Sequence, residues 1–172
     1  MFLIPLPTIE LRQVEFSAAV RAEVDRLLAR YPVKKAAILP VFHLAEREFG
    51  IIDESVMVMI GGLLDLPPSK VLGVYTFYTW FKRAGTGRHL LQVCCTLPCA
   101  LRGSDIVVNH IVKRLGIKVG ESTKDGVFTL RKVECLAACD KAPCIQINED
   151  MYENLTLTQV DKILDQLQQK KK

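Results

Sequence analysis

Cysteine is missing from more than half of this chain. The sequence also lacks other features, and each missing feature excludes a class of protein. None of the first 93 of the 172 residues is a cysteine. No two of the six cysteines that follow have the C-x-x-C spacing of a thioredoxin-type dithiol. Residues 1–5 lack the basic region, long apolar core and small-residue cleavage site of a secretory signal. We therefore expect an intracellular protein, in which structural disulfides are not favoured.

Charge of one sign is not concentrated anywhere either. The formal net charge of +4 is shared evenly by the two halves, and the only basic block is the C-terminal Lys170-Lys171-Lys172. Nucleic-acid binding therefore has no support. No uncharged run approaches the roughly twenty residues of a membrane-spanning helix. The sequence predicts a soluble protein without a membrane span, which can still dock onto a membrane complex.

The six cysteines form two tight groups, namely Cys94, Cys95 and Cys99, then Cys135, Cys139 and Cys144. The first contains a C-x4-C pair (Cys94, Cys99) and the second a C-x3-C pair (Cys135, Cys139). Four-cysteine zinc sites typically use shorter C-x2-C knuckles. Four cysteine thiolates are the standard ligands of a 2Fe–2S cluster. The spacing favours an iron–sulfur cluster, with zinc and a redox thiol system as the alternatives.

The first half of the chain has only helical patterns. Apolar residues recur at helical spacing over residues 16–31 and 36–49, and a third helix, capped by Asp53, runs to about Leu64. A fourth helix, capped by Ser69, is predicted over residues 70–81. We therefore predict an N-terminal helical bundle over residues 1–81 and a linker over residues 82–88.

The second half alternates between strands and helices. A strand over residues 89–93 leads into Cys94, and a helix from Pro98 or Cys99 is closed by Gly116. Strands over 127–133, 144–147 and 151–155 and a helix over 158–167 follow. The helix between the first two strands implies a crossover, and the consecutive strands imply an antiparallel pair. The fold class is therefore α+β, with a small mixed sheet in a second domain over residues 89–172.

Two stretches carry a resemblance to a known family. Residues 93–103 read V-C-C-T-L-P-C-A-L-R-G, and residues 133–139 read V-E-C-L-A-A-C. On these stretches the chain resembles the small 2Fe–2S subunit of the NADH dehydrogenase module of respiratory complex I (NADH:quinone oxidoreductase). The same family serves NAD-linked hydrogenases and formate dehydrogenases. The likeness runs from about residue 16 to 167, and implies a helical bundle followed by a thioredoxin-like α/β domain.

Carried over position by position, the resemblance implies that one 2Fe–2S cluster is bound by Cys94, Cys99, Cys135 and Cys139. The chain departs from the family at three positions. Cys95 replaces a small or hydroxyl residue, Ala138 a glycine, and Cys144 an apolar residue. None of these changes removes a ligand. However, Cys139 and Cys144 also form a C-x4-C pair, which leaves open which thiols bind.

The resemblance implies an electron-transfer subunit of an oxidoreductase. It would accept one electron from the reduced FMN of a partner flavoprotein, which also holds the NADH site, beside further iron–sulfur subunits. The isolated chain is not expected to oxidise NADH. The alternatives are the equivalent diaphorase subunit of an NAD-linked hydrogenase or formate dehydrogenase, a stand-alone thioredoxin-like ferredoxin, and a zinc-stabilised adaptor. The implied location is cytoplasmic, on the cytoplasmic face of the inner membrane within a peripheral arm, or on the matrix side in a eukaryote.

Overall fold

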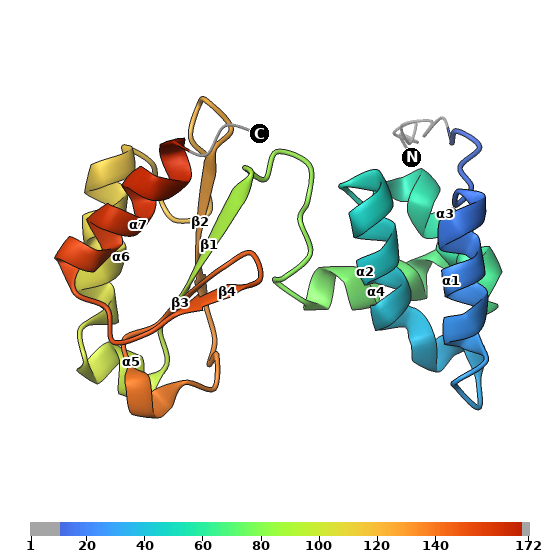
Figure 1. The fold of residues 1–172 in the computed structure, drawn as a ribbon, viewed down its shortest axis with the longest axis horizontal. Coiled ribbons are helices and arrows are strands. Elements are labelled where there is room, and N and C mark those ends of the chain that lie inside the picture. The colour runs from blue at the N-terminus through green and yellow to red at the C-terminus, as the bar shows by residue number, and fades with distance from the viewer. Residues whose placement is uncertain (1–10, 170–172) are drawn as a thin grey trace, which may run out of the picture. The chain divides into compact units, whose positions relative to one another are not determined.

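A computed structural model describes residues 11–169 of the chain (Figure 1). Contacts divide the chain into two compact units, with the boundary between Ala84 and Gly85. This boundary falls within residues 82–88, whose assignment as a linker stays a prediction. Residues 1–5, where no secretory signal is predicted, and the tail Lys170-Lys171-Lys172 lie outside the described residues.

The first unit contains helices only within its described part. These are α1 (Ala18–Leu28), the short 3-10 helix η1 (Lys34–Ala37), α2 (Ile38–Phe49), α3 (Glu54–Leu64) and α4 (Pro68–Phe77). Asp53 caps α3 as predicted, because its carboxylate accepts the N–H of Val56 at 3.0 Å. Gly50 ends α2 at φ +77°, a left-handed conformation that glycine adopts without a steric penalty.

The core of this unit gathers around Phe42, which is fully buried. The ring of Phe81 meets it edge-on with the centroids 5.2 Å apart, and the ring of Tyr75 lies 5.9 Å away. The Tyr75 hydroxyl donates a hydrogen bond to the carbonyl of Lys82 at 2.5 Å. Aromatic packing therefore fixes the segment that follows α4.

The fourth helix differs from the prediction at both ends. It starts at Pro68, which occupies the first helical position, so Ser69 lies inside the helix and does not cap it. It ends at Phe77, four residues earlier than predicted, because Tyr78 is extended. The early end turns Phe81 back into the core, while the side chain of Phe77 is 77% exposed. Phe77 and Phe81 therefore do not lie on one face of a continuous helix.

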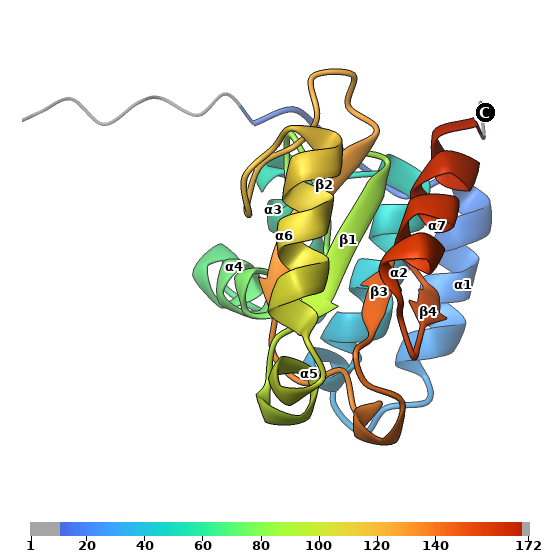
Figure 2. The same cartoon turned by 90° about the vertical axis from the view of Figure 1, so that its left-hand side faces the viewer.

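The second unit holds a four-stranded mixed sheet in the order β2-β1-β3-β4. Its strands are β1 (His89–Cys94), β2 (Phe128–Val133), β3 (Ile145–Ile147) and β4 (Asp150–Tyr152). The central strand β1 is parallel to β2 and antiparallel to β3, which is antiparallel to β4. Helices α6 (Ser104–Leu115) and α7 (Leu157–Gln169) lie side by side over one face of this sheet (Figure 2). The predicted α+β class is confirmed.

Buried side chains of the sheet and its two helices form one core. Leu91 and Val93 of β1, Leu130 of β2, Ile111 of α6 and Leu164 of α7 belong to it, and each is at most 3% exposed. The parallel pairing of β1 and β2 requires a crossover, which α6 supplies. This core fixes the relative position of the two strands that lead to the cysteines.

Two elements of the second unit differ from their predictions. The predicted continuous helix up to Leu115 is split into α5 (Leu97–Leu101) and α6, because Gly103 between them is left-handed at φ +91°. The predicted strand over residues 151–155 is β4, which is shorter and ends at Tyr152. The left-handed Asn154 at φ +51° follows it and interrupts the extended chain.

A segment before β2 covers the outer edge of that strand. The N–H of Gly120 donates to the carbonyl of Leu130 at 2.7 Å, and the carbonyl of Glu121 accepts the N–H of Leu130 at 3.2 Å. An isolated antiparallel bridge joins Ser122 to Thr129. The backbone groups at the middle of β2 are therefore paired on both sides.

Within residues 11–169, no individual helix has the length and apolar character to cross a membrane. The pair formed by α3 and α4, which is bent by 113° at its break, reaches that length and composition only when taken together.

Candidate metal centre

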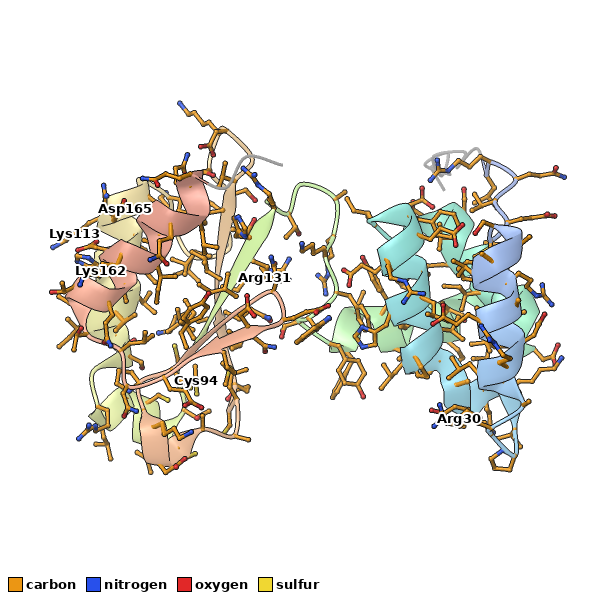
Figure 3. The ribbon with its side chains drawn as sticks, viewed as in Figure 1. Arg30, Cys94, Lys113, Arg131, Lys162 and Asp165 are labelled. Atoms are coloured by element: carbon orange, nitrogen blue, oxygen red, sulfur yellow. The ribbon has the colours of Figure 1, made fainter. Side chains whose placement is uncertain are left out.

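The two parallel strands β1 and β2 end beside each other at one edge of the sheet. Cys94, the last residue of β1, is in register with Val133, the last residue of β2. The N–H of Cys95 extends this pairing by donating to the carbonyl of Val133 at 3.0 Å. Figure 3 labels Cys94 at this end of β1, next to the short helix α5 of Figure 1. The sheet topology thus brings the first cysteine group beside the loop that begins at Glu134.

The first group supplies two buried thiols to this edge. Cys94 and Cys99 are 2% and 1% exposed, and Cys99 lies in α5. The sulfur of Cys94 lies 3.3 Å from the hydroxyl oxygen of Thr96, within hydrogen-bond distance. A helix start with Pro98 in its first turn turns the chain back so that the two sulfurs face one another.

The second group supplies two exposed thiols. The sulfurs of Cys135 and Cys139 lie 3.7 Å apart, and the N–H of Ala137 donates to the Cys135 sulfur at 3.3 Å. Ala137 is left-handed at φ +62°, whereas Ala138, which stands where the family has glycine, is not left-handed. Ala137 is therefore the residue that adopts the left-handed conformation in this loop, and its N–H points at the Cys135 sulfur.

Cys144 lies closer to the predicted ligands than the sequence alone indicates. It is 1% exposed, and its sulfur is 3.8 Å from the sulfur of Cys99. The sulfurs of Cys94, Cys99 and Cys144 all lie within 4.8 Å of one another. The N–H of Cys94 also donates to the carbonyl of Cys144 at 3.2 Å. The signal for this proximity was the C-x4-C spacing from Cys139, but only the pairing of β3 with β1 places Cys144 beside the first group.

Cys95 lies apart from this set of sulfurs. It packs against the core of the sheet and helices, whereas Cys94, Cys99 and Cys144 belong to a separate small cluster with Ala138 and Ala142. Its thiol donates back to the carbonyl of Val93 at 3.4 Å. Neighbouring side chains of an extended strand point to opposite faces, which explains the separation.

The thiols of this edge influence one another's ionisation. Burial opposes ionisation of Cys94, but hydrogen bonds from Thr96 and from the backbone of Leu136 lower its pKa to about 7. The pKa of Cys139 is raised, first by its hydrogen bond with Cys135 and further by the charges of Cys99 and Cys94. Burial, followed by the contact with Cys99, raises the pKa of Cys144 to about 12. The loop of Cys135 and Cys139 therefore lies within electrostatic reach of Cys94 and Cys99, whereas the three sulfurs that lie within 4.8 Å of one another are those of Cys94, Cys99 and Cys144.

The donors gathered here are suited to an iron–sulfur cluster. The set contains thiols only, and soft thiolate ligands select zinc, copper(I) or iron–sulfur clusters. Two pairs of thiols from two loops match the four-thiolate requirement of a 2Fe–2S cluster. The assignment of Cys94, Cys99, Cys135 and Cys139 as its ligands stays a prediction.

Two of the cations near the site are neutralised by carboxylates. The ammonium of Lys132 pairs with Asp105 and that of Lys141 pairs with Glu153, both at 2.9 Å. Arg102 donates to the carbonyl of Ala142 at 3.4 Å. Because both lysines are paired, backbone N–H groups are the more direct source of positive potential at the sulfurs.

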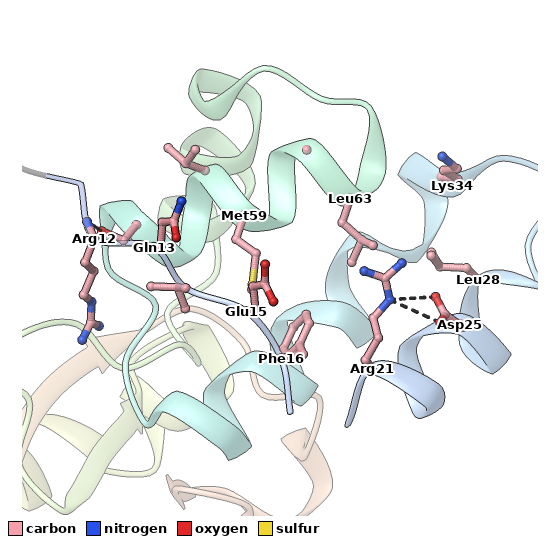
Figure 4. A pocket seen from close by; sticks show the side chains of 14 residues that line it. Arg12, Gln13, Glu15, Phe16, Arg21, Asp25, Leu28, Lys34, Met59 and Leu63 are labelled. Atoms are coloured by element: carbon pink, nitrogen blue, oxygen red, sulfur yellow. Dashed lines mark hydrogen bonds and ion pairs between the residues drawn. The ribbon is translucent and has the colours of Figure 1, made fainter. Parts of the chain in front are cut away.

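A cavity of about 760 Å³ belongs to the first unit and contains no cysteine (Figure 4). Phe16, Met59 and Leu63 contribute apolar surface to it, and Arg21 on its wall is paired with Asp25 at 3.0 Å. The residues that line it include no cysteine, so the cavity offers no thiolate ligand to a metal cluster. The chemistry of this protein is concentrated at the cysteine edge of the second unit.

The family of this chain follows from a comparison with known protein families. The model of the thioredoxin-like 2Fe-2S ferredoxin family matches residues 24–168. The chain belongs to this family. The match spans both units, and it confirms the predicted thioredoxin-like fold and the predicted family.

Relatives within the family include two respiratory proteins. A subunit of the NADH-quinone oxidoreductase of Rickettsia conorii is 42% identical over 147 residues, which cover 84% of this chain and 88% of the relative. The mitochondrial NADH dehydrogenase (ubiquinone) flavoprotein 2 of Dictyostelium discoideum is 39% identical over 160 residues, which cover 91% of this chain and 65% of the relative.

Among solved structures, the fold is similar to part of an NAD+-reducing NiFe-hydrogenase in the H2-reduced state. The TM-score is 0.69 at 20% identity, and the similarity covers 79% of this chain and 23% of the hydrogenase chain. At this identity the similarity is one of fold alone.

Proposed function

We propose that this chain is an electron-transfer subunit of an NADH:quinone oxidoreductase. It holds one 2Fe–2S cluster between Cys94, Cys99, Cys135 and Cys139, and it accepts one electron from the reduced FMN of a partner subunit. The observation that carries the proposal is that the register of the parallel strands β1 and β2 places the buried thiols of Cys94 and Cys99 beside the loop of Cys135 and Cys139, where the backbone of Leu136 hydrogen-bonds to the Cys94 sulfur.

Several features of the edge support the binding of such a cluster. The donors are thiols, the Ala137 N–H points at the Cys135 sulfur, and hydrogen bonds lower the pKa of Cys94 against the effect of burial. The hydrogen bonds to Cys94 favour its thiolate form, which is the form that binds iron. When bound, a 2Fe–2S cluster takes up and releases single electrons.

The two pairs of thiols differ in exposure, and this difference indicates the side from which a partner can approach. Cys94 and Cys99 are enclosed by the second unit, whereas Cys135 and Cys139 are exposed. The exposed loop is the side from which a partner subunit can approach most closely. The partner and its FMN and NADH are inferred from the relatives, which are named as subunits of NADH dehydrogenases.

The same relatives favour this host complex over a hydrogenase. Over the matched regions the respiratory relatives are about 40% identical to this chain, whereas the hydrogenase is 20% identical and shows the fold alone. We propose that the protein works in the peripheral arm of the complex, on the cytoplasmic face of the membrane or on the matrix side in a eukaryote. Subunits that co-purify with the native protein will test this assignment.

Metal and sulfide analysis of the anaerobically purified full chain tests the cluster. The chain should contain about two irons and two acid-labile sulfides. Stoichiometric zinc without sulfide would contradict the proposal, and would indicate a structural adaptor instead.

Reduction by NADH tests the role of the partner. NADH alone should leave the visible absorption of the cluster unchanged, because the chain lacks a recognisable dinucleotide motif. NADH together with the flavoprotein subunit should bleach the absorption. Bleaching by NADH without any flavoprotein would refute the division of labour, and no bleaching with it would refute the assigned partner.

A further inference from the structure

A fifth thiol contacts one of the proposed ligands. The sulfur of Cys144 lies 3.8 Å from that of Cys99, within the distance of a sulfur hydrogen bond. Cys144 directly precedes β3, and its carbonyl accepts the N–H of Cys94 at 3.2 Å. The next residue, Ile145, is paired with Val93 of β1. The backbone therefore holds the Cys144 thiol beside the site from the sheet side.

The hydrogen bond between the two sulfurs can run in only one direction once Cys99 is a ligand. A metal-bound cysteine is a thiolate, which has no hydrogen to donate. The remaining thiol hydrogen belongs to Cys144. The Cys144 side chain is buried in a small cluster with Ala138 and Ala142, and the Cys99 sulfur lies within hydrogen-bond distance of it. The Cys99 sulfur is therefore an acceptor for that hydrogen.

We propose that Cys144 is a positioning residue that tunes the cluster, by donating an S–H···S hydrogen bond to the Cys99 thiolate. This inference rests on the proposed function, because it requires Cys99 to be a ligand. Hydrogen bonds to the cluster sulfurs are one determinant of reduction potential. A donor withdraws electron density from the thiolate and stabilises the more negative, reduced state. Cys144 therefore raises the reduction potential above that of a chain with an apolar residue there.

Substitutions at position 144 separate a hydrogen-bond donor from a packing residue. Cys144→Val and Cys144→Ala remove the donor, and both keep an apolar side chain in a site where a free thiol packs as a small hydrophobe. Cys144→Ser keeps a donor. Cys95→Val is the matched control, because Cys95 neighbours Cys94 in sequence but donates to the Val93 carbonyl.

The first measurement is a redox titration of the iron-loaded full chain, followed by the EPR signal of the reduced state. Both Cys144→Val and Cys144→Ala should shift the midpoint potential to more negative values. Cys144→Ser should shift it less, and Cys95→Val should leave it unchanged. An unchanged or raised potential in the valine and alanine variants would overturn the proposal. Loss of the cluster from both would also overturn it, since Cys144 would then be a ligand or a structural requirement.

Resonance Raman spectroscopy in H2O and D2O supplies a readout that packing does not affect. The iron–thiolate stretching bands of the wild type should shift in D2O, and part of that shift should disappear in Cys144→Val but persist in Cys95→Val. Equal shifts in all variants would contradict the hydrogen bond. Reduction of the wild-type cluster by NADH through the flavoprotein does not depend on these results, so failure here is distinguishable from failure of the proposed function.

Discussion

Two adjacent glycines of α3 provide a controlled test of how tightly the helical unit is packed. A Cβ atom on Gly61 would lie 2.7 Å from the carbonyl oxygen of Leu66 and 3.6 Å from a methyl carbon of Val71. A Cβ atom on Gly62 would have no atom within 4 Å. Because the 2.7 Å neighbour is a backbone atom, it cannot move away without shifting the turn between α3 and α4.

Both alanine variants gain from replacing glycine in a helix, but only Gly61→Ala also overpacks the core. Replacing a helical glycine by alanine stabilises a helix by about 0.5–1 kcal/mol, and this term applies to both positions. Gly62→Ala should therefore raise the free energy of unfolding by about that amount. Overpacking costs about 1–3 kcal/mol, so the free energy of unfolding of Gly61→Ala should be lower than that of Gly62→Ala by about this amount. For a unit of this size, that corresponds to a melting temperature lower by at least about 4 °C.

The chain contains its own probe for this comparison. Trp80 is the only tryptophan, and it packs against the core of the first unit. Its fluorescence during urea unfolding reports that unit, while the visible absorption of the cluster reports the second unit. The variants should differ in the fluorescence transition only. Equal stability of the two variants, or greater stability of Gly61→Ala, would refute the contact with Leu66.

Three further predictions concern the second unit. Serine at Cys135 should weaken or abolish the EPR signal of the dithionite-reduced chain, as it should at the other three proposed ligands, whereas serine at Cys95 should preserve it. Ala137→Gly should retain the cluster but Ala137→Val should lose much of it, because β-branched residues do not tolerate the left-handed backbone at φ +62°; iron content measures this. Hydrogen bonds from Thr123, then Gln168 and the Val127 N–H, lower the pKa of Asp125 to about 2. This carboxylate stabilises the fold above its unfolded pKa of about 3.9, and the contribution disappears as the pH falls from about 4 to 2. Asp125→Asn should therefore lower the urea midpoint of the cluster-free chain at pH 7, and the gap to the wild type should close over that interval.

Local patterns in the sequence were sufficient to predict most elements. The Asp53 cap predicted α3. A short apolar run before Cys94 and an alternating pattern over residues 127–133 predicted the two strands that lead to the cysteines. The grouping of the thiols predicted a site built from two loops. These features could be predicted because each depends on residues close together in the chain.

Features that depend on distant contacts could not be predicted in this way. The end of α4 at Phe77 follows from the packing of Phe81 against Phe42, which lies in another helix. The contact of Cys144 with Cys99 exists because β3 pairs with β1. A local pattern alone is not sufficient to predict either contact. The split between α5 and α6 is different, since Gly103 was visible in the sequence but only its left-handed conformation reveals the break.

The segment that covers β2 has a consequence for self-association. A bare edge strand presents unpaired N–H and C=O groups that can recruit a strand from another molecule and start aggregation. In this chain Gly120 and Glu121 already occupy the outward-facing groups of Leu130, and Ser122 bridges to Thr129. The strand that carries the second cysteine loop is thereby closed to edge-to-edge growth. The loop of Cys135 and Cys139 can thus be exposed while the strand beside it is protected from polymerising.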